Sequence, residues 1–358
     1  MTERPTTHPA AGAAPGIEPS LRLPQDEPLV YTTRGDLVEN VHRGRICVVS
    51  ADDGRVLAAV GDPEGPAYLR STAKPFQALG PLLSGAAEAF GLDDRHLALM
   101  CASHRGSAEQ MAVLEELVRR TGLTEELLAM RPASPLEPEA REAWLRAGGQ
   151  KRRLYHMCAG KHLGVLAWCK RRGWPLEGYT RPDHPAQRET VARLAAWADL
   201  TPDDIRLGVD GCGLPVGAMP LRNMALLYGR LACPDAAAGA ASGEADAVRA
   251  AAAAMNRHPA LVEGEGRLAS LLLTDPGIVA KSGAQGVFAI GLRRQRVGVA
   301  IVVTDGAETA WPAVVRAVLE RLGALSPELA ARLDAQFFRD IRSETGEVAG
   351  RMEAAFTW

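Results

Sequence analysis

The chain has 358 residues, of which 47% are hydrophobic and 23% charged, and its formal net charge is -2. This composition is ordinary for a globular protein with a sizeable core, and the near-neutral charge argues against nucleic acid or an anionic membrane as a partner. No apolar run reaches the length of a membrane span, and the N-terminal residues show no secretory signal. The six cysteines are scattered rather than spaced as a disulfide framework, which predicts a reducing, cytoplasmic location.

The N-terminal residues 1–27 are rich in Pro, Ala, Thr and Gly without periodicity, which predicts a disordered tail. Two β-rich runs, 45–50 and 55–61, flank an Asp-Gly pair and therefore predict a hairpin. We expect a single catalytic domain over residues 28–342, followed by a weakly patterned C-terminal tail over 343–358.

Ser71 and Lys74 stand three residues apart at the head of a predicted helix that ends near Gly85. Residues i and i+3 share a helical face, so we predict that the Lys74 amine reaches the Ser71 hydroxyl. A neutral lysine can accept a serine proton, and burial or nearby positive charge lowers a lysine pKa enough to make it neutral. By itself, however, such a spacing is more often a solvated lysine beside a helical serine.

A second candidate segment follows the apolar run 97–100 and reads Cys-Ala-Ser-His-Arg-Gly over 101–106. Small residues and a glycine suit a place where a ligand approaches the backbone closely. Ser103 and His104 are candidates for handling a proton there. The alternative for His104 is a half-buried histidine whose hydrogen bonds are satisfied within the protein.

Two later segments carry cysteines that are candidates for metal binding. Cys158 and Lys161 share a face on a helical turn, and Cys212 lies in a tight turn that begins at Asp210. Thiolates favour zinc, but a lysine ligand must be neutral and is unusual, so spacing alone favours buried structural cysteines. The Asp210 turn either holds a carboxylate against a cleft or is an ordinary turn.

The last candidate is Lys281, in a Lys-Ser-Gly sequence on a predicted strand. This element resembles the Lys-Thr-Gly that accompanies Ser-x-x-Lys in serine β-lactamases and penicillin-binding proteins. Two Ser/Lys elements in this order, with Ser103 between them, favour a Ser-Lys hydrolase well beyond what Ser71 and Lys74 indicate alone.

Five motifs stand in unbroken order along the chain: Arg-Ser-Thr-Ala-Lys-Pro-Phe-Gln (70–77), Cys-Ala-Ser-His-x-Gly (101–106), Cys-Ala-Gly-Lys-His (158–162), Asp-Gly-Cys-Gly-x-Pro (210–215) and Lys-Ser-Gly-Ala-Gln-Gly (281–286). Together they resemble the bacterial class 3 L-asparaginases, the rhizobial inducible type also called the asparaginase II family. The resemblance implies an α/β fold, an α+β sandwich with helices packed on a serine β-lactamase-like antiparallel sheet. It also implies hydrolysis of L-asparagine to aspartate and ammonia by a homodimer.

The resemblance assigns roles to ten residues of this chain. The family's catalytic groups form two Ser-Lys tandems, which correspond to Ser71 with Lys74 and Ser103 with Lys281. Its zinc ligands correspond to Cys158, Lys161 and Cys212. Positions that line its substrate site correspond to Arg70, His162 and Asp210. We expect Arg70 to suit a substrate α-carboxylate and Asp210 an α-amino group.

Two departures from the family pattern bear on the substrate. The family's Cys-Gly-x-His-x-Pro loop is replaced by residues 130–135, Met-Arg-Pro-Ala-Ser-Pro, and its Asn-Asn-Cys-Ser-Gly-Lys-His by residues 156–162 with His-Met in place of Asn-Asn and Ala in place of Ser. Our hypothesis is an acyl-enzyme mechanism on a small amino-acid amide, with Ser71 as nucleophile. Two alternatives are a Ser-Lys hydrolase of another amide or acyl substrate, and a catalytically silent homologue that binds an amino acid.

Overall fold

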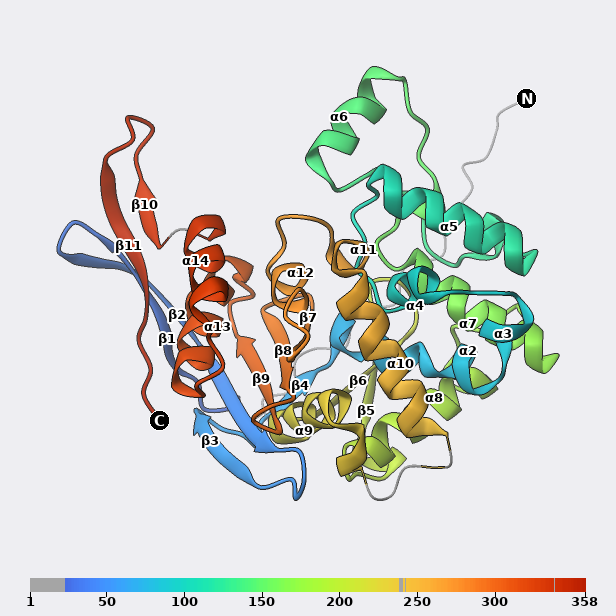
Figure 1. Ribbon diagram of the computed structural model, residues 1–358, viewed down its shortest axis with the longest axis horizontal. Coiled ribbons are helices and arrows are strands. Elements are labelled where there is room, and N and C mark those ends of the chain that lie inside the picture. Colours follow the sequence, from blue (N-terminus) through green and yellow to red (C-terminus); the bar gives the residue numbers. More distant parts are fainter. Residues whose placement is uncertain (1–22, 238–240, 242, 338) are drawn as a thin grey trace, which may run out of the picture.

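The computed structural model describes residues 23–237, 241, 243–337 and 339–358. Within these residues the main element is an antiparallel sheet of eight strands with helices on both sides (Figure 1). Seven strands follow the spatial order β10-β11-β1-β2-β9-β8-β7, and β3 pairs with β2 beside this path. Their bounds are β1 (Glu27–Arg34), β2 (Leu37–Ser50), β3 (Val56–Val60), β7 (Ile278–Ser282), β8 (Val287–Leu292), β9 (Val297–Val303), β10 (Asp340–Arg342) and β11 (Val348–Ala354).

A smaller three-stranded antiparallel sheet and a body of helices complete the domain. The small sheet has the order β4-β6-β5, from β4 (Pro66–Tyr68), β6 (Pro215–Pro220) and β5 (Arg206–Val209). The α-helices are α1 (Lys74–Gln77), α2 (Leu79–Leu83), α3 (Ala86–Ala89), α4 (Asp94–Met100), α5 (Ala108–Thr121), α6 (Pro138–Arg146), α7 (Ala159–Arg172), α8 (Pro185–Trp197), α9 (Leu221–Ala232), α10 (Glu244–Arg257), α11 (Pro259–Glu263), α12 (Leu268–Leu273), α13 (Trp311–Arg321) and α14 (Pro327–Gln336). A short 3-10 helix, η1 (Arg70–Ala73), leads into α1.

The central strands β7, β8 and β9 are buried along their whole length, because each face of the sheet carries its own core. Side chains alternate between the two faces along a strand. On β8, Ala289 belongs to the core shared with α1, α4, α7 and α9, whereas Phe288 and Ile290 belong to the core shared with α12, α13 and α14. Figure 1 shows α13 and α14 apart from the larger helical body that holds α4, α5, α7 and α10. This burial explains the nearly continuous apolar runs of these strands.

Helix α9 lies directly against the middle of the sheet, where glycines replace side chains. A Cβ atom on Gly298 would stand 1.8 Å from the carbonyl oxygen of Ala225, and one on Gly291 would stand 2.1 Å from that of Tyr228. The two backbones therefore approach more closely than any larger residue permits. The hydroxyl of Tyr228, on the same helix, donates to the carbonyl oxygen of Thr72 at 2.9 Å. Through this bond α9 holds the η1 turn in place beneath the sheet.

The expected antiparallel sheet with packed helices is confirmed, but the expected C-terminal tail is wrong. Strand β11 pairs with both β1 and β10, and Phe356 is buried against the core. Alternating exposure along β11, which contains Gly350 and Arg351, weakens its strand pattern in the sequence, and pairing with β1 supplies what the pattern lacks. At the other end, β1 already begins at Glu27, and residues 1–22 of the expected N-terminal tail lie outside the described part.

Across the described part of the chain, no helix combines the length and the apolar character needed to cross a bilayer.

Candidate active site

Three of the four predicted catalytic residues meet around one hydroxyl. Ser103 Oγ lies 2.9 Å from Lys74 Nζ and 3.0 Å from Lys281 Nζ. Lys74 begins α1, Ser103 follows α4, and Lys281 lies on β7, so three distant segments supply them. Both lysines are fully buried and Ser103 is half-buried. The pairing of Ser103 with Lys281 that the family resemblance implies is present in this geometry, whereas the contact of Lys74 with Ser103 was not expected from the sequence.

Ser71 lies in the neighbouring η1 turn, but its expected hydrogen bond to Lys74 is not among those found in the described residues. Lys74 Nζ turns instead to the Ala102 carbonyl oxygen, at 2.6 Å, and to Ser103 Oγ. A buried amine must find acceptors, and the end of α4 offers two of them. Ser71 itself is buried, with 8% of its surface exposed. The prediction of a direct Ser71–Lys74 contact is thus wrong for this conformation.

Burial has the largest effect on the protonation state of Lys74. It lowers the pKa of Lys74 from its ordinary 10.5 to about 8, and the positive charges of Lys161 and Lys281 act in the same direction. The negative charge of a Cys158 thiolate acts against this shift. A lysine with such a pKa is partly neutral near neutral pH, which is the state that accepts a proton from a hydroxyl.

Glu263 is a site residue that the sequence analysis missed. It is 3% exposed and pairs with Lys281, while its Oε1 also accepts from Ser282 N at 3.0 Å and Ser282 Oγ at 2.6 Å. Burial raises its pKa, but the attraction of Lys281 and these hydrogen bonds outweigh burial and leave the pKa below its ordinary value. Glu263 stands in the run Glu-Gly-Glu-Gly (263–266), and nothing in this run indicates that one of its two glutamates is buried. Only the fold identifies Glu263 as a site residue.

Arg70 and Asp210, the expected ligands of a substrate's charged head, bind each other. Arg70 Nε donates to Asp210 Oδ1 at 2.9 Å, and Lys161 Nζ lies 3.8 Å from Asp210 Oδ2. Arg70 has φ +49°, an unusual value for a residue with a side chain, directly before Ser71. The two residues also line a cleft of about 10 Å³, room for about one water molecule.

The expected zinc ligands lie together beside this ion pair. Lys161 Nζ donates to Cys212 Sγ at 3.1 Å, and a hydrogen bond from Cys212 is the main reason why the pKa of Cys158 falls well below its ordinary value. Two adjacent sulfurs and an amine are donors that suit zinc. Burial lowers the pKa of Lys161, but the charges of Cys158, Cys212 and Asp210 outweigh burial and raise it above its ordinary value. Lys161 must lose its proton to act as a zinc ligand. No cluster of three or more His, Cys, Asp and Glu side chains suited to a metal occurs in the described residues.

His162 and His104 are both buried and neutral. His162 Nδ1 lies 2.6 Å from Tyr179 Oη, while its Nε2 has no partner in the described residues; burial lowers its pKa well below the ordinary value. His104 contacts the His156 carbonyl oxygen through Nε2 and accepts from Gly106 N through Nδ1. Burial lowers the pKa of His104 to about 4. His104 is thus fully rather than half buried, and both of its ring nitrogens have partners within the protein: Nδ1 in its own loop and Nε2 at His156.

The replaced loop at 130–135 packs as ordinary structure. Met130 is buried in the core, and the backbones of Ala133 and Arg152 pair as an isolated bridge. Arg153 donates to the carbonyl oxygens of Leu128 and Met130. The loop is thus held by its backbone in this protein.

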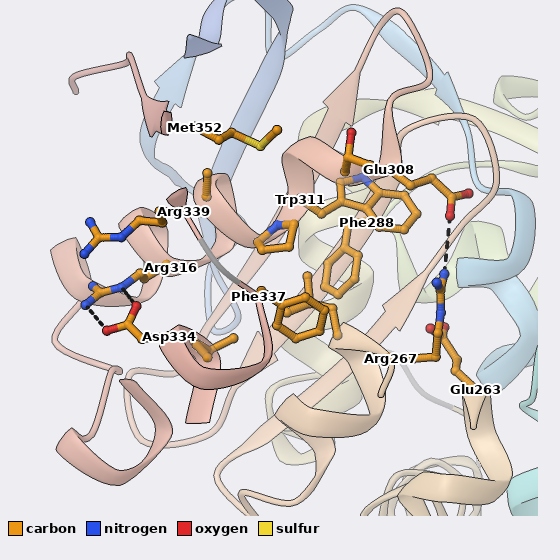
Figure 2. Close-up of a pocket in the computed structure, with 15 residues that line it drawn as sticks. Glu263, Arg267, Phe288, Glu308, Trp311, Arg316, Asp334, Phe337, Arg339 and Met352 are labelled. Carbon is orange, nitrogen blue, oxygen red and sulfur yellow. Dashed lines mark hydrogen bonds and ion pairs between the residues drawn. The ribbon is translucent and has the colours of Figure 1, made fainter. Parts of the chain in front are cut away.

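A cavity that Glu263 helps to line lies on the other face of the sheet. It measures about 460 Å³ and has an aromatic floor that includes Phe288, Trp311 and Phe337 (Figure 2). Its charged margin includes Arg267, paired with Glu308. Glu263 lines this cavity while it holds Lys281, so it stands between the cavity and the lysines.

Comparison with known protein families identifies the family to which the chain belongs. The sequence model of the family described as L-asparaginase II matches residues 30–354. The chain belongs to the L-asparaginase II family. It is an amidohydrolase by class, and the predicted family is confirmed. A comparison with curated proteins gave no match.

Three solved structures are similar at low sequence identity. A β-lactamase from Mycobacterium bovis is similar over 78% of this chain and 94% of its own, with 14% identity and a TM-score of 0.39. The protein Mglu is similar over 79% of this chain and 68% of its own, with 17% identity and a TM-score of 0.37. A Bacillus glutaminase is similar over 78% of this chain and 91% of its own, with 14% identity and a TM-score of 0.35.

Proposed function

We propose that the protein hydrolyses the side-chain amide of a small α-amino acid, with L-asparagine as substrate and aspartate and ammonia as products. The observation that carries the proposal is a buried amine, Lys74, in contact with the Ser103 hydroxyl and one helical turn from Ser71. Serine attack on an amide requires such a base. Membership in the L-asparaginase II family supports the choice of substrate.

The proposed reaction has two stages. The neutral amine of Lys74 accepts the Ser71 proton, and Ser71 Oγ attacks the amide carbon. The C–N bond then breaks, the departing nitrogen takes the proton and leaves as ammonia, and Ser71 carries an acyl ester. Water attacks the ester, the acid product leaves, and the hydroxyl of Ser71 is restored. The backbone N–H of Ser71, in the first turn of a helix that leaves such groups without internal partners, is suited to the oxyanion.

The ion pair between Arg70 and Asp210 suggests how a zwitterionic substrate is recognised. In the free site each charged group satisfies the other, at 2.9 Å. An α-amino acid carries one carboxylate and one ammonium, so its head can replace the partner of each group with a charge of the same sign. We therefore propose that the pair opens on binding, with Arg70 on the carboxylate and Asp210 on the amine. The same exchange widens the small cleft between them.

The nucleophile needs a direct test, because Ser103 rather than Ser71 touches the lysines in this conformation. For Ser71 to act, the Lys74 side chain must turn from Ala102 toward it, a rotamer change open to a long side chain. The test is ammonia release from asparagine by Ser71→Ala and Ser103→Ala, with Ser84→Ala as control. In the described residues Ser84 Oγ bonds only locally: it donates to the Pro81 carbonyl oxygen at 3.3 Å and accepts from Ala86 N at 3.4 Å.

Intact-protein mass spectrometry of samples quenched during turnover complements the rates. We expect Ser71→Ala to lose turnover and the acyl adduct, and Ser103→Ala to keep the adduct while turning over slowly. An adduct that survives in Ser71→Ala and disappears in Ser103→Ala would reverse the assignment. Turnover of other amides or esters but not asparagine would favour a Ser-Lys hydrolase of a different substrate, and asparagine binding without turnover would favour the silent homologue.

We further propose zinc as a structural or electrostatic partner of the site, held by Cys158, Lys161 and Cys212. When bound, such an ion supplies Lewis-acid charge beside Asp210. The homodimer expected from the family resemblance stays a prediction, which the mass of the protein in solution would check.

A further inference from the structure

The carboxylate of Glu263 completes a chain of hydrogen bonds that begins at Lys74. The chain runs from Lys74 Nζ to Ser103 Oγ at 2.9 Å, from there to Lys281 Nζ at 3.0 Å, and from Lys281 to Glu263 Oε1. Lys74, Lys281 and Glu263 are all buried. Charges so deep in a protein interact strongly, so the position of each proton matters.

The acceptors around Lys281 match the three N–H donors of a protonated lysine. Its three N–H donors have three acceptors, namely Ser103 Oγ, the carbonyl oxygen of Ser282 at 2.9 Å and Glu263 Oε1. Because Ser103 Oγ accepts from Lys281, the hydroxyl proton of Ser103 is free to point at Lys74 Nζ. A neutral Lys74 can receive that proton with its lone pair and still donate to the Ala102 carbonyl oxygen at 2.6 Å.

The two lysines therefore differ in their counter-charge. Lys281 has a carboxylate partner, whereas Lys74 bonds to a neutral carbonyl oxygen and a hydroxyl. When the pair shares one proton, it has two arrangements, with the proton on either lysine. Only the arrangement with the proton on Lys281 leaves Lys74 able to act as a base.

We propose that Glu263 is a positioning residue that holds the shared proton on Lys281 and thereby makes Lys74 the base of the site. The proposal rests on the function proposed above and deepens it, because it names the residue that decides between the two lysines. Within the described residues Glu263 is not hydrogen-bonded to Ser71 or Ser103; it acts through Lys281.

Glu263 is held firmly enough for this role. Glu263 is the last residue of α11, and this helix is tied to the Ser103 loop, because Ser103 N donates to the Val262 carbonyl oxygen at 2.8 Å. Gln110 Nε2 donates to the carbonyl oxygen of Ala260 at 3.0 Å. Ser282 holds the carboxylate itself through two hydrogen bonds. Glu263, Lys281 and Ser103 are therefore joined in one hydrogen-bonded network.

Other charged groups near this chain set the background that any titration must include. Arg105 and Tyr228 interact with Glu263, while Lys161, Cys158 and Cys212 interact with Lys74. In the described residues none of these is hydrogen-bonded to Lys281. The carboxylate of Glu263 is thus the group whose removal acts most directly on the lysine pair.

The test that needs no substrate is a titration of the lysine side chains by NMR. The chain has only five lysines, so selective ¹³C labelling of the ε-carbon gives few signals, which Lys74→Arg and Lys281→Arg assign. In the native protein we expect Lys74 to lose its proton at lower pH than Lys281. In Glu263→Gln, the Lys281 signal should move toward that of the neutral amine at a given pH, because an opposite charge in contact is gone. If Lys281 titrates at or below Lys74 in the native protein, the proposal is overturned.

The kinetic test uses the pH profile of kcat/KM for ammonia release. When the carboxylate of Glu263 is removed, the pair of Lys74 and Lys281 loses its first proton at lower pH. In part of the molecules, however, that proton comes from Lys281, and Lys74 then stays charged and cannot act as the base. In Glu263→Gln the acid limb should therefore move to lower pH while the plateau falls about tenfold or more. Ser282→Ala, which removes one bond to Glu263, should show a smaller change in the same direction.

Glu308→Gln is the matched control, because Glu308 lies on the same cavity and pairs with Arg267 rather than with a lysine (Figure 2). We expect it to leave the profile unchanged. A plateau that falls in Glu263→Gln with an unmoved acid limb would assign Glu263 a purely structural role. If no variant and not even the native protein releases ammonia, the proposed function fails, and the NMR titration still decides the role of Glu263.

Discussion

Replacement of Lys74 by methionine should stabilise the fold at neutral pH and abolish hydrolysis. Lys74 is fully buried, and burial lowers its pKa from 10.5 to about 8. A drop of about 2.5 pH units means that an ammonium held there at pH 7 costs the folded state about 3 kcal/mol. Methionine fills a similar volume without charge, and its lost hydrogen bonds to Ala102 and Ser103 offset about 1–2 kcal/mol of the gain. We expect a net stabilisation of about 1–2 kcal/mol at pH 7.

The pH dependence of this difference is the sharper part of the prediction. The unfolded chain keeps the Lys74 proton up to about pH 10.5, whereas the folded chain releases it near pH 8. The unfolded state therefore binds more protons in that window, so the penalty is full below pH 8 and fades as the pH rises to 10.5. The free-energy difference between Lys74→Met and the native protein should thus change by about 3 kcal/mol across the window, in favour of the native protein.

Urea denaturation followed by circular dichroism at a series of pH values measures this difference. Lys151→Met, which removes an exposed lysine, is the control and should show no such dependence. In the native enzyme, the neutral fraction of Lys74 rises from about 10% at pH 7 to about 90% at pH 9, so kcat/KM should rise about ninefold. A stability difference that is the same at every pH, together with a flat rate profile between pH 7 and 9, would refute the reasoning.

Three further changes test other parts of the structure. Gly298→Ala should destabilise the fold by about 1–3 kcal/mol or more, measured by urea denaturation, because the added Cβ meets the Ala225 carbonyl oxygen at 1.8 Å. Asp210→Asn should raise KM for asparagine about 10-fold or more with a smaller effect on kcat, because the charged partner of the substrate amine and of Arg70 is lost; an unchanged KM argues against the exchange of partners. Cys158→Ala should lower the zinc content measured by elemental analysis, and native zinc content in this variant dismisses the site.

Much of the fold was predictable, because the central strands carry unusually clear patterns. Residues 297–303 form a continuous apolar run, which a strand buried on both faces requires, and the Asp-Gly turn correctly placed the hairpin of β2 and β3. Strand β11 escaped prediction because half of it faces solvent, where Arg351 and Glu353 are exposed, and because Gly350 weakens its inner side. Its place in the sheet depends on pairing with β1, more than 300 residues earlier in the chain, and no local pattern reports that.

Part of the candidate site was also predictable from the sequence, and part was not. Lys74, Ser103 and Lys281 were found from motif order, and they do meet. The direct contact between Ser71 and Lys74 failed, because spacing along a helix fixes where two side chains start but not which acceptor a buried amine chooses. Glu263 was missed for a related reason, since its identity as a buried counter-ion depends on tertiary contacts with β7.

The three buried lysines show why those missed contacts decide the chemistry. Lys161 lies against Cys212 and Asp210, and Lys281 against Glu263, so both have anionic or acidic partners. Lys74 alone among the three has only neutral hydrogen-bond partners in the described residues. Coulomb attraction is strong in a buried site, so the lysine without an anion in contact is the one that gives up its proton first. In the mechanism proposed above, the surroundings of the other two lysines thus select Lys74 as the base, and altering Glu263 should change the protonation of Lys74 without touching it.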